Sequence, residues 1–245
     1  SASRCTQWMI LCQSWWRSMP ESKVSIVIPV YNHYALTNKM LYSLQKKEKE
    51  SIGKILVIDD CSPDEEVQTG LAWWKSQWDV IEVVRNETNL GFLQSSNKGM
   101  KMITGNLDEI VILLSNDVEI YGSFIWQIQE HLKSSEARKL IGGVIYAHDT
   151  GWNRFGNEIF PYVEGWLLAT TKAGWGDSGY FDERYSPCIF EDVDLSTQAR
   201  QMGYTLVALN SPALRHIGGQ SISYTDSRHE LTRKNQNIFG EKWIR

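Results

Sequence analysis

Four short runs rich in Val, Ile and Leu recur along the first half of the chain, and longer segments with helical spacing separate them. The runs lie at 24–28, 55–58, 81–84 and 110–114, and the helical segments at about 36–47, 64–78 and 91–102. Such alternation is typical of strand-helix-strand units that build a parallel sheet. The sequence therefore predicts an α/β fold, with a mostly parallel central sheet flanked by helices. Pro29 is expected to end the first strand, because proline cannot donate to a ladder.

Beyond residue 120 the pattern is looser. We expect a helix near 123–134, a strand near 141–146, a helix over about 193–202 and a strand at 205–209, with Gly- and Trp-rich loops between them. No linker or internal repeat divides this part from the first half. Residues 23–245 are therefore predicted to form one domain with a regular half and an irregular half.

Residues 1–22 are predicted to be an N-terminal extension. Their large apolar side chains recur at helical spacing and form one stripe, at Trp8, Leu11, Cys12, Trp15, Trp16 and Met19. Such a helix packs on its own domain, or it contacts a membrane surface or a partner protein through residues 8–19. The segment lacks the cationic start and clean apolar run of a signal peptide.

Composition and charge exclude several classes of function. With 245 residues, 42% of them hydrophobic, the chain can bury a sizeable core. A net charge of -4 argues against a broad basic face, so nucleic acid is not an expected partner. The longest apolar runs fall far short of the roughly 20 residues that a membrane-spanning helix needs. The four cysteines form no Cys-x-x-Cys pair and are expected to be reduced thiols in a cytoplasmic protein.

Polar residues follow three of the predicted strands, at Tyr31-Asn32, Asp59-Asp60 and Ser115-Asn116-Asp117. Ligands of open α/β sheets bind outside the carboxyl ends of the strands. Acids at such positions hold a divalent cation or a nucleotide base, although single acids there also serve as turn residues or helix caps. Because three acids occupy corresponding strand ends, the pattern favours a ligand site.

Two further candidates lie in the irregular half, and the residues alone leave both open. Glu191 and Asp192 begin a predicted helix after an aromatic loop; apolar neighbours raise the basicity of a carboxylate, but acids also suit any helix start. His216 precedes a flexible segment, residues 217–221, whose backbone amides could approach phosphates. A lone histidine is more often a hydrogen-bonded structural residue.

Taken in order, the motifs of the chain resemble those of a known family. They are Val24–Asn32, Val57–Asp64, Asn89-Leu90-Gly91, Asn97-Lys98-Gly99, Leu114–Asp117, Gly179–Glu183, Phe190–Leu195, Gly203-Tyr204, His216 and Asn237–Trp243. The set resembles family 2 inverting glycosyltransferases of the GT-A fold, and looks most like the rhamnosyltransferase-like branch that builds bacterial surface polysaccharides. The resemblance covers about residues 23–245 and implies a Rossmann-like nucleotide-binding half and an acceptor-binding half.

The resemblance also implies roles for individual residues. The donor-binding residues would be Pro29, Tyr31, Asn32, Asp59, Asn97, Asn116 and Asp117. Asp59 would read the base, and Asp117 with His216 would hold a divalent cation, Mn2+ or Mg2+. Asp192 would be the general base, with Glu191 beside it to position the acceptor. Ser115 departs from the pattern, because it replaces the first acid of the Asp-x-Asp motif and removes one expected metal ligand.

By the same resemblance, the chain moves a sugar from a UDP- or dTDP-sugar to a glycan or lipid-linked glycan, in the cytoplasm or at the membrane surface. A separate hypothesis rests on glycine content and positive charge: residues 218–221, with Arg228, Arg233 and Lys234 beyond them, would close over the diphosphate. Two other functions remain open: a catalytically silent nucleotide-sugar- or glycan-binding module, motivated by Ser115, and a sugar-phosphate nucleotidyltransferase, for which no Gly- and Lys-rich activation loop is seen.

The 11 tryptophans divide into groups. Trp73, Trp74, Trp78 and Trp126 fall in predicted helices and are expected to pack there. Three others lie in the acceptor half before the paired carboxylates, at Trp152, Trp166 and Trp175. An indole face there can stack on a sugar ring, and Trp166 is the leading candidate for acceptor binding.

Overall fold

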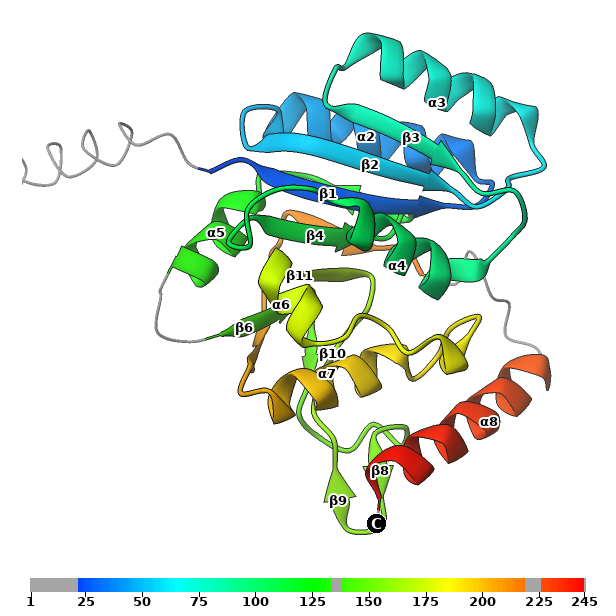
Figure 1. Cartoon of the computed structure of the whole chain (residues 1–245), viewed down its shortest axis with the longest axis vertical. Coiled ribbons are helices and arrows are strands. Elements are labelled where there is room, and N and C mark those ends of the chain that lie inside the picture. The colour runs from blue at the N-terminus through cyan, green and yellow to red at the C-terminus, as the bar shows by residue number, and fades with distance from the viewer. Residues whose placement is uncertain (1–21, 134–137, 219–225, 245) are drawn as a thin grey trace, which may run out of the picture.

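A computed structural model describes residues 22–133, 138–218 and 226–244. A seven-stranded sheet with the order β12-β6-β11-β4-β1-β2-β3 forms its centre (Figure 1). The strands are β1 (Val24–Val30), β2 (Ile52–Asp59), β3 (Ile81–Arg85), β4 (Ile110–Leu114), β6 (Lys139–Gly142), β11 (Leu167–Thr171) and β12 (Thr205–Ala208). The apolar stripe at 8–19 and the loop at 219–221 lie outside the described residues.

Helices cover both faces of this sheet. They are α2 (Tyr34–Glu48), α3 (Glu65–Gln77), α4 (Gly91–Met102), α5 (Ile125–Lys133), α6 (Lys172–Asp177), α7 (Glu191–Gln201) and α8 (Asp226–Trp243). Side chains of α2, α3 and α5 pack in one apolar cluster, and those of α4, α6, α7 and α8 pack in a second. The predicted α/β class, with helices flanking the sheet, is therefore confirmed.

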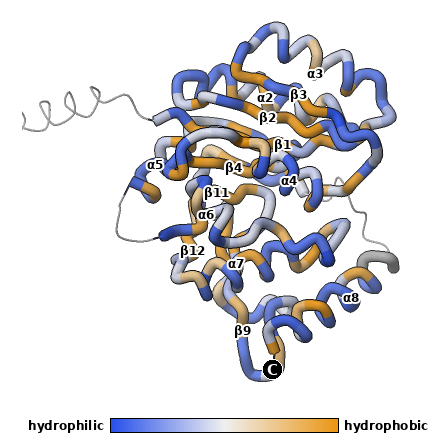
Figure 2. Tube along the Cα trace, in the orientation of Figure 1, coloured by the Kyte–Doolittle hydropathy of each residue, from blue (hydrophilic) through white to orange (hydrophobic). Residues whose placement is uncertain are grey.

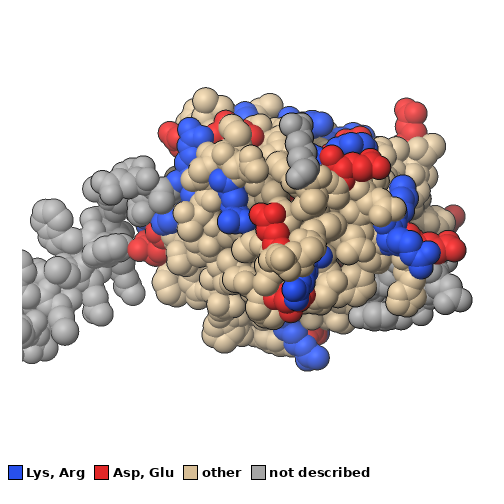
Figure 3. All heavy atoms as spheres, turned by 90° about the horizontal axis from the view of Figure 1, so that it is seen from below, with Lys and Arg blue, Asp and Glu red and all other residues tan. Residues whose placement is uncertain are grey.

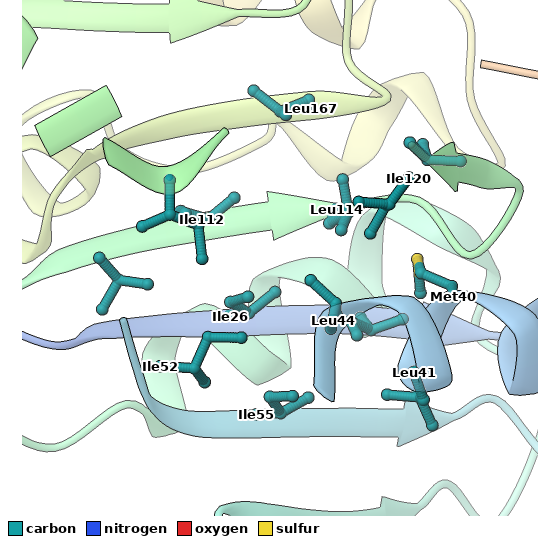
Figure 4. Packing of buried hydrophobic residues seen from close by; sticks show 14 of the residues in the cluster. Ile26, Met40, Leu41, Leu44, Ile52, Ile55, Ile112, Leu114, Ile120 and Leu167 are labelled. Atoms are coloured by element: carbon teal, nitrogen blue, oxygen red, sulfur yellow. The ribbon is translucent and has the colours of Figure 1, made fainter. Parts of the chain in front are cut away.

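The two apolar clusters follow from alternation along the strands. Ile26 and Ile28 point to the first cluster, whereas Val27 between them points to the second. Figure 4 shows Ile26 beside Leu44 of α2 and Ile55 of β2, and Figure 2 shows the hydrophobic residues concentrated on the central strands. Because both faces of these strands are covered, each strand reads as a continuous apolar run.

The predicted parallel arrangement of the first four strands is confirmed, but β1 does not end before Pro29. β1 pairs in parallel with β2 and β4, and β2 pairs in parallel with β3. The carbonyl of Val30 accepts a hydrogen bond from the Asp60 N–H at 2.8 Å, so the backbone of Val30 faces β2 and that of Pro29 faces the other side. Pairing with β4 stops at Val27. No ladder donor is needed at residue 29, and the strand continues through the proline.

The irregular half differs most from expectation. The strand predicted at 141–146 is two strands: β6, which ends at Gly142, and β7 (Ile145–Tyr146), with Gly143 and Val144 between them. An added Cβ at Gly142 would lie 2.4 Å from the Val163 side chain, and one at Gly143 would lie 1.8 Å from the Trp166 ring. Strand β11, which the sequence analysis missed, lies between β4 and β6 and is antiparallel to both.

Three small ribbons complete the structure. β5 (Val118–Ile120) pairs with β13 (Leu214–His216), β7 with β10 (Tyr162–Val163), and β8 (Arg154–Phe155) with β9 (Glu158–Ile159), all antiparallel. Among the described helices, none is both long and apolar enough to cross a bilayer. On the face drawn in Figure 3, acidic and basic side chains are interspersed.

Two of the four tryptophans expected to pack in helices are mainly exposed. Trp74 and Trp78 are buried in the first cluster, and the Trp74 indole N–H donates to Asn38 Oδ1 at 2.8 Å. Trp73 and Trp126 are 52% and 51% exposed, because they lie on the solvent sides of their helices. Helical spacing alone did not separate the buried members of this group from the exposed ones.

Candidate active site

A cavity of about 740 Å³ opens at the carboxyl ends of β1 and β4. The β7–β10 ribbon and the first residues of α7 form its opposite wall. Eight of the predicted site residues line it, namely Pro29, Tyr31, Asn116, Asp117, Trp166, Glu191, Asp192 and His216. The location agrees with the rule that open α/β sheets bind ligands beyond their strand ends.

Asp117 and His216 meet because the β5–β13 ribbon aligns them. His216 pairs with Val118, and the Ile217 N–H donates to the Asp117 carbonyl at 3.0 Å. His216 Nε2 lies 3.3 Å from Asp117 Oδ1, and the Ser115 hydroxyl donates to the same oxygen at 2.6 Å. Burial acts to raise the pKa of Asp117, but the hydrogen bonds from His216 and Ser115 outweigh it and hold the pKa below its ordinary value. This carboxylate is therefore ionised.

Three predicted donor residues do not line the cavity. Asp59 is buried behind the wall, where it pairs with Arg85 and accepts the Ser62 N–H at 2.9 Å. Asn97 is also buried. Its side-chain nitrogen donates a hydrogen bond to the Phe181 carbonyl, and its side-chain oxygen accepts one from the Phe181 N–H. Asn32 bonds the Ser62 hydroxyl through its backbone N–H at 2.9 Å. The structure gives these residues roles in holding the strand-end loops together.

Asp60, rather than Asp59, reaches the cavity. Its carboxylate accepts hydrogen bonds at 2.8 Å from the Asn86 side chain and from the backbone N–H groups of Leu90 and Gly91. These contacts fix the start of α4 against the end of β2. The sequence pair Asp59-Asp60 gave no signal to separate the two acids, because both follow the strand directly.

Glu191 and Asp192 form a pair of carboxylates at the start of α7. Glu191 is 8% exposed, and its Oε2 has no hydrogen-bond partner; Asp192 is half-buried and accepts the Val193 N–H at 2.9 Å. Burial first, and the Asp192 charge second, raise the pKa of Glu191. Burial also raises the pKa of Asp192, and the nearby Glu164 carboxylate adds to this rise. Paired acids with raised pKa values in a cavity are typical of acid-base sites.

The loop before this pair is held by α8. Ile189 and Phe190 both have a φ of 76°, a region that non-glycine residues rarely adopt. The fully buried Asn235 of α8 donates its side-chain nitrogen to the carbonyls of Tyr185, Cys188 and Ile189, at 3.0, 2.8 and 2.7 Å. This contact fixes the turn that directs Glu191 and Asp192 to the cavity. Sequence reasoning missed Asn235, because its position inside an amphipathic helix gives no functional signal.

Of the three tryptophans in the irregular half, two line the cavity and one is buried in the core. Trp166 lines the cavity, stacks on His216 with ring centroids 5.4 Å apart, and donates its indole N–H to Glu164 at 2.8 Å. Trp152 also lines the cavity and is 43% exposed. Trp175 is buried in the second apolar cluster and bonds the Val111 carbonyl, so the expectation that it stacks on a sugar is wrong. Glu164, another residue that the sequence analysis missed, faces the cavity beside Asp192.

The side chains of Asp117 and His216 suit a hard divalent cation whose remaining ligands come from a bound substrate. No group of three His, Cys, Asp or Glu residues with metal-binding geometry occurs in the described part of the chain. Asp117 and His216 supply one carboxylate and one imidazole, and Mg2+-type sites commonly use one or two carboxylates plus substrate phosphates. None of the described Lys and Arg residues lines the cavity.

The predicted loop closure falls partly outside the described residues. Residues 219–221 and the side chain of Arg228 are among those not described. Arg233 and Lys234 are exposed on α8 and do not line the cavity.

Residues 25–186 match the family model described as "Glycosyl transferase family 2". A curated protein of Haemophilus influenzae, "Uncharacterized glycosyltransferase", is 31% identical over 83 residues, which are 34% of this chain and 26% of that protein. The chain therefore spans about a quarter of this relative's length.

Solved structures share the fold at low identity. A mannosyltransferase of Pyrobaculum calidifontis, in complex with GDP-Man and Mn2+, aligns over 83% of this chain and 61% of its own, with 16% identity and a TM-score of 0.59. GalNAc-T7 with UDP, GalNAc and Mn2+ aligns over 91% and 56%, with 16% identity and a TM-score of 0.62. TarS of S. aureus aligns over 89% and 39%, with 18% identity and a TM-score of 0.60. The described fold is that of GT-A glycosyltransferases.

Proposed function

The chain belongs to glycosyl transferase family 2, and on that premise we propose that it moves a sugar from a nucleoside-diphosphate sugar to a hydroxyl of a glycan or lipid-linked glycan. We further propose that transfer inverts the anomeric carbon. The motif order supports a place in the rhamnosyltransferase-like branch and a role in surface polysaccharide synthesis.

One observation carries this proposal: two different acidic clusters line one cavity. Asp117 and His216 lie at the carboxyl end of β4, whereas Glu191 and Asp192 lie at the start of α7. A displacement at an anomeric carbon needs charge compensation for the leaving group and a base for the incoming hydroxyl. The cavity supplies residues suited to both needs.

In the proposed reaction, Asp192 accepts the proton of the acceptor hydroxyl. The acceptor oxygen forms a bond to the anomeric carbon as the bond from that carbon to the diphosphate oxygen breaks. Nucleoside diphosphate leaves with the bonding electrons, and the configuration inverts in one step. Glu191 holds a proton more tightly than an ordinary glutamate, because burial opposes its charge, so it is suited to donate a hydrogen bond to the bound acceptor.

Asp117 and His216 are the proposed cation ligands, and the cation would be Mn2+ or Mg2+. When bound, it would neutralise charge that develops on the leaving diphosphate. Two of the structural neighbours were solved with Mn2+, which supports this choice. The ionised state of Asp117 suits metal binding, since ligands must be deprotonated.

For the donor, we propose direct contact with Pro29, Tyr31, Asn116 and Asp117, which line the cavity. Asn32, Asp59 and Asn97 then act from behind the wall, by holding the loops that carry those residues. UDP and dTDP are the proposed nucleotides.

A thermal-shift screen of nucleotide sugars, with and without Mn2+, tests the proposal. A bound donor raises the melting temperature by mass action, and the rise should depend on Mn2+. Asp192→Asn should keep this shift and lose transfer, whereas Glu158→Gln, an exposed substitution in β9, should keep both. If no nucleotide sugar or nucleoside diphosphate shifts melting, the proposal is wrong.

Ser115 favours one second candidate, a catalytically silent binding module. Ser115 stands at the position of the first acid of the Asp-x-Asp motif, and its hydroxyl donates a hydrogen bond to Asp117, so the described residues offer fewer cation ligands. A silent module predicts a thermal shift with nucleotide sugar but no release of nucleoside diphosphate with any acceptor. Turnover that Asp192→Asn abolishes would exclude it.

A further inference from the structure

Beside Asp192, the cavity has an aromatic wall from the β7–β10 ribbon. Tyr146 and Tyr162 are cross-strand partners whose rings stack at 5.2 Å and 26°. Both line the cavity, as does the exposed Trp152 from the loop between the two strands. The apolar face of a pyranose ring packs well on such aromatic surfaces, with hydroxyls at its edge free for hydrogen bonds.

Carboxylates surround this wall. Glu164 accepts the Tyr146 hydroxyl at 3.1 Å and the Trp166 indole N–H at 2.8 Å, while Glu191 and Asp192 lie on the facing helix start. Glu191 is more than nine-tenths buried, lines the cavity and leaves Oε2 without a partner. An unpartnered buried oxygen of this kind awaits a hydrogen-bonding group from a ligand.

No described Lys or Arg lines the cavity, and His216, the histidine in its lining, lies against Asp117 at the proposed cation site. The charged groups beside the aromatic wall are therefore carboxylates, of which Glu164 is hydrogen-bonded to the wall itself. At an effective dielectric of about 20, two unit charges about 6 Å apart interact strongly enough to change an equilibrium about 100-fold. The aromatic wall therefore discriminates by charge as well as by shape.

We propose that Tyr146, Trp152, Tyr162 and Glu164 form an acceptor subsite that takes an uncharged or amino sugar and rejects sugars bearing a carboxylate or phosphate. Glu164 is the residue that sets this charge selectivity. The proposal rests on the proposed glycosyl transfer, because it specifies the acceptor of that reaction.

Paired acceptors provide the test. With the donor that gives the largest thermal shift and with Mn2+, release of nucleoside diphosphate is measured for p-nitrophenyl glycosides of neutral and amino sugars. Each is paired with its uronic acid or 6-phosphate. We expect kcat/KM to favour the neutral or amino member by about 100-fold. A preference for the acidic member, or equal rates, would overturn the subsite.

Two variants make the test specific to Glu164. Glu164→Gln keeps the shape and an acceptor oxygen, and should reduce the neutral-over-acidic ratio about 100-fold, to near one. The exposed Glu158→Gln should leave the ratio unchanged. Because the ratio is taken within one variant, loss of folded protein cancels from it. An unchanged ratio in Glu164→Gln contradicts the role of Glu164.

Binding separates this inference from the proposed function. With UDP and Mn2+ present, tryptophan fluorescence is followed as neutral and acidic methyl glycosides are added, and neutral glycosides should quench it at lower concentration. If nucleotide shifts melting but no neutral glycoside binds up to its solubility limit, the subsite is wrong and the donor site stands. If no nucleotide shifts melting, the proposed function itself fails.

Discussion

Replacing Glu191 by Gln should stabilise the protein, and increasingly so as the pH rises. Glu191 is buried, Oε2 has no partner, and Asp192 is its sequence neighbour. These conditions raise the pKa of Glu191 from 4.5 to about 8. The folded state thus binds this proton more tightly than the unfolded chain does. Below pH 4.5 the Glu191 carboxyl is protonated in both states, and its contribution to the free energy of unfolding is at its maximum. That contribution is lost as the pH rises to about 8, because the carboxyl ionises more readily in the unfolded chain than in the folded one.

The size of the effect follows from that shift. Each pKa unit corresponds to about 1.4 kcal/mol, so the full rise corresponds to about 5 kcal/mol of lost stability at pH 9. This is a large part of the 5–15 kcal/mol that typical domains possess. Glu191→Gln is neutral at every pH and removes the loss. The gain over wild type should be small at pH 5 and reach several kcal/mol at pH 9.

Urea unfolding followed by tryptophan fluorescence measures this difference, at five pH values from 5 to 9. The control is Glu158→Gln, which makes the same chemical change at an exposed position of β9. Its difference from wild type should stay nearly constant with pH. If the gain for Glu191→Gln is also constant from pH 5 to 9, the argument that burial raises the pKa of this carboxyl is refuted.

Four further predictions concern the site. Asp192→Asn should reduce the rate of transfer about 1000-fold and leave the affinity for the nucleotide sugar unchanged. In a pH-rate profile of the wild type, kcat/KM should rise with pH near 6, the pKa to which burial raises Asp192. His216→Ala should weaken Mn2+ binding about tenfold, measured by titrating the thermal shift with Mn2+; equal midpoints would remove His216 from the cation site. Asn235→Leu should lower kcat at least tenfold but leave the nucleotide-induced shift intact, because only the loop before Glu191 is released; an unchanged kcat would contradict its positioning role. Gly143→Ala should displace Trp166, whose ring lies 1.8 Å from the added Cβ, and so alter Trp fluorescence and raise the acceptor KM; wild-type values of both would refute this contact.

The regular half of the fold could be predicted from the sequence because local signals there agree. The runs at 24–28, 55–58 and 110–114 are buried on both faces, and each of the first two is followed directly by a helix of ordinary length. Helix 91–102 was predicted with its observed bounds, since Gly91 marks its start. In contrast, β11 was missed because its sequence, Leu-Leu-Ala-Thr-Thr, lies among Gly- and Trp-rich loops and becomes a strand only between β4 and β6.

The site was predictable where function follows from strand ends and less so where it depends on packing. The strand-end pattern predicted that Tyr31, Asn116 and Asp117 lie near one another, and all three line the cavity. It could not show that Asp59 turns away to Arg85 while Asp60 faces the cavity, because that choice depends on a partner 26 residues away. Glu164 was missed for a similar reason: its partners Tyr146 and Trp166 meet it only through tertiary folding.

The β5–β13 ribbon gives the site a dependence on the order of folding. It joins residues 118 and 216, which are about 100 positions apart, and Glu191, Asp192 and Asn235 likewise come from the last third of the chain. During synthesis the strands β1 to β4 emerge first and can begin to pack before this third exists. A nascent or proteolysed chain ending near residue 186 would lack both the histidine and the paired acids. Under the proposed function, such fragments would lack the general base and one cation ligand, so the ability to transfer a sugar would arise only once the last third of the chain has folded.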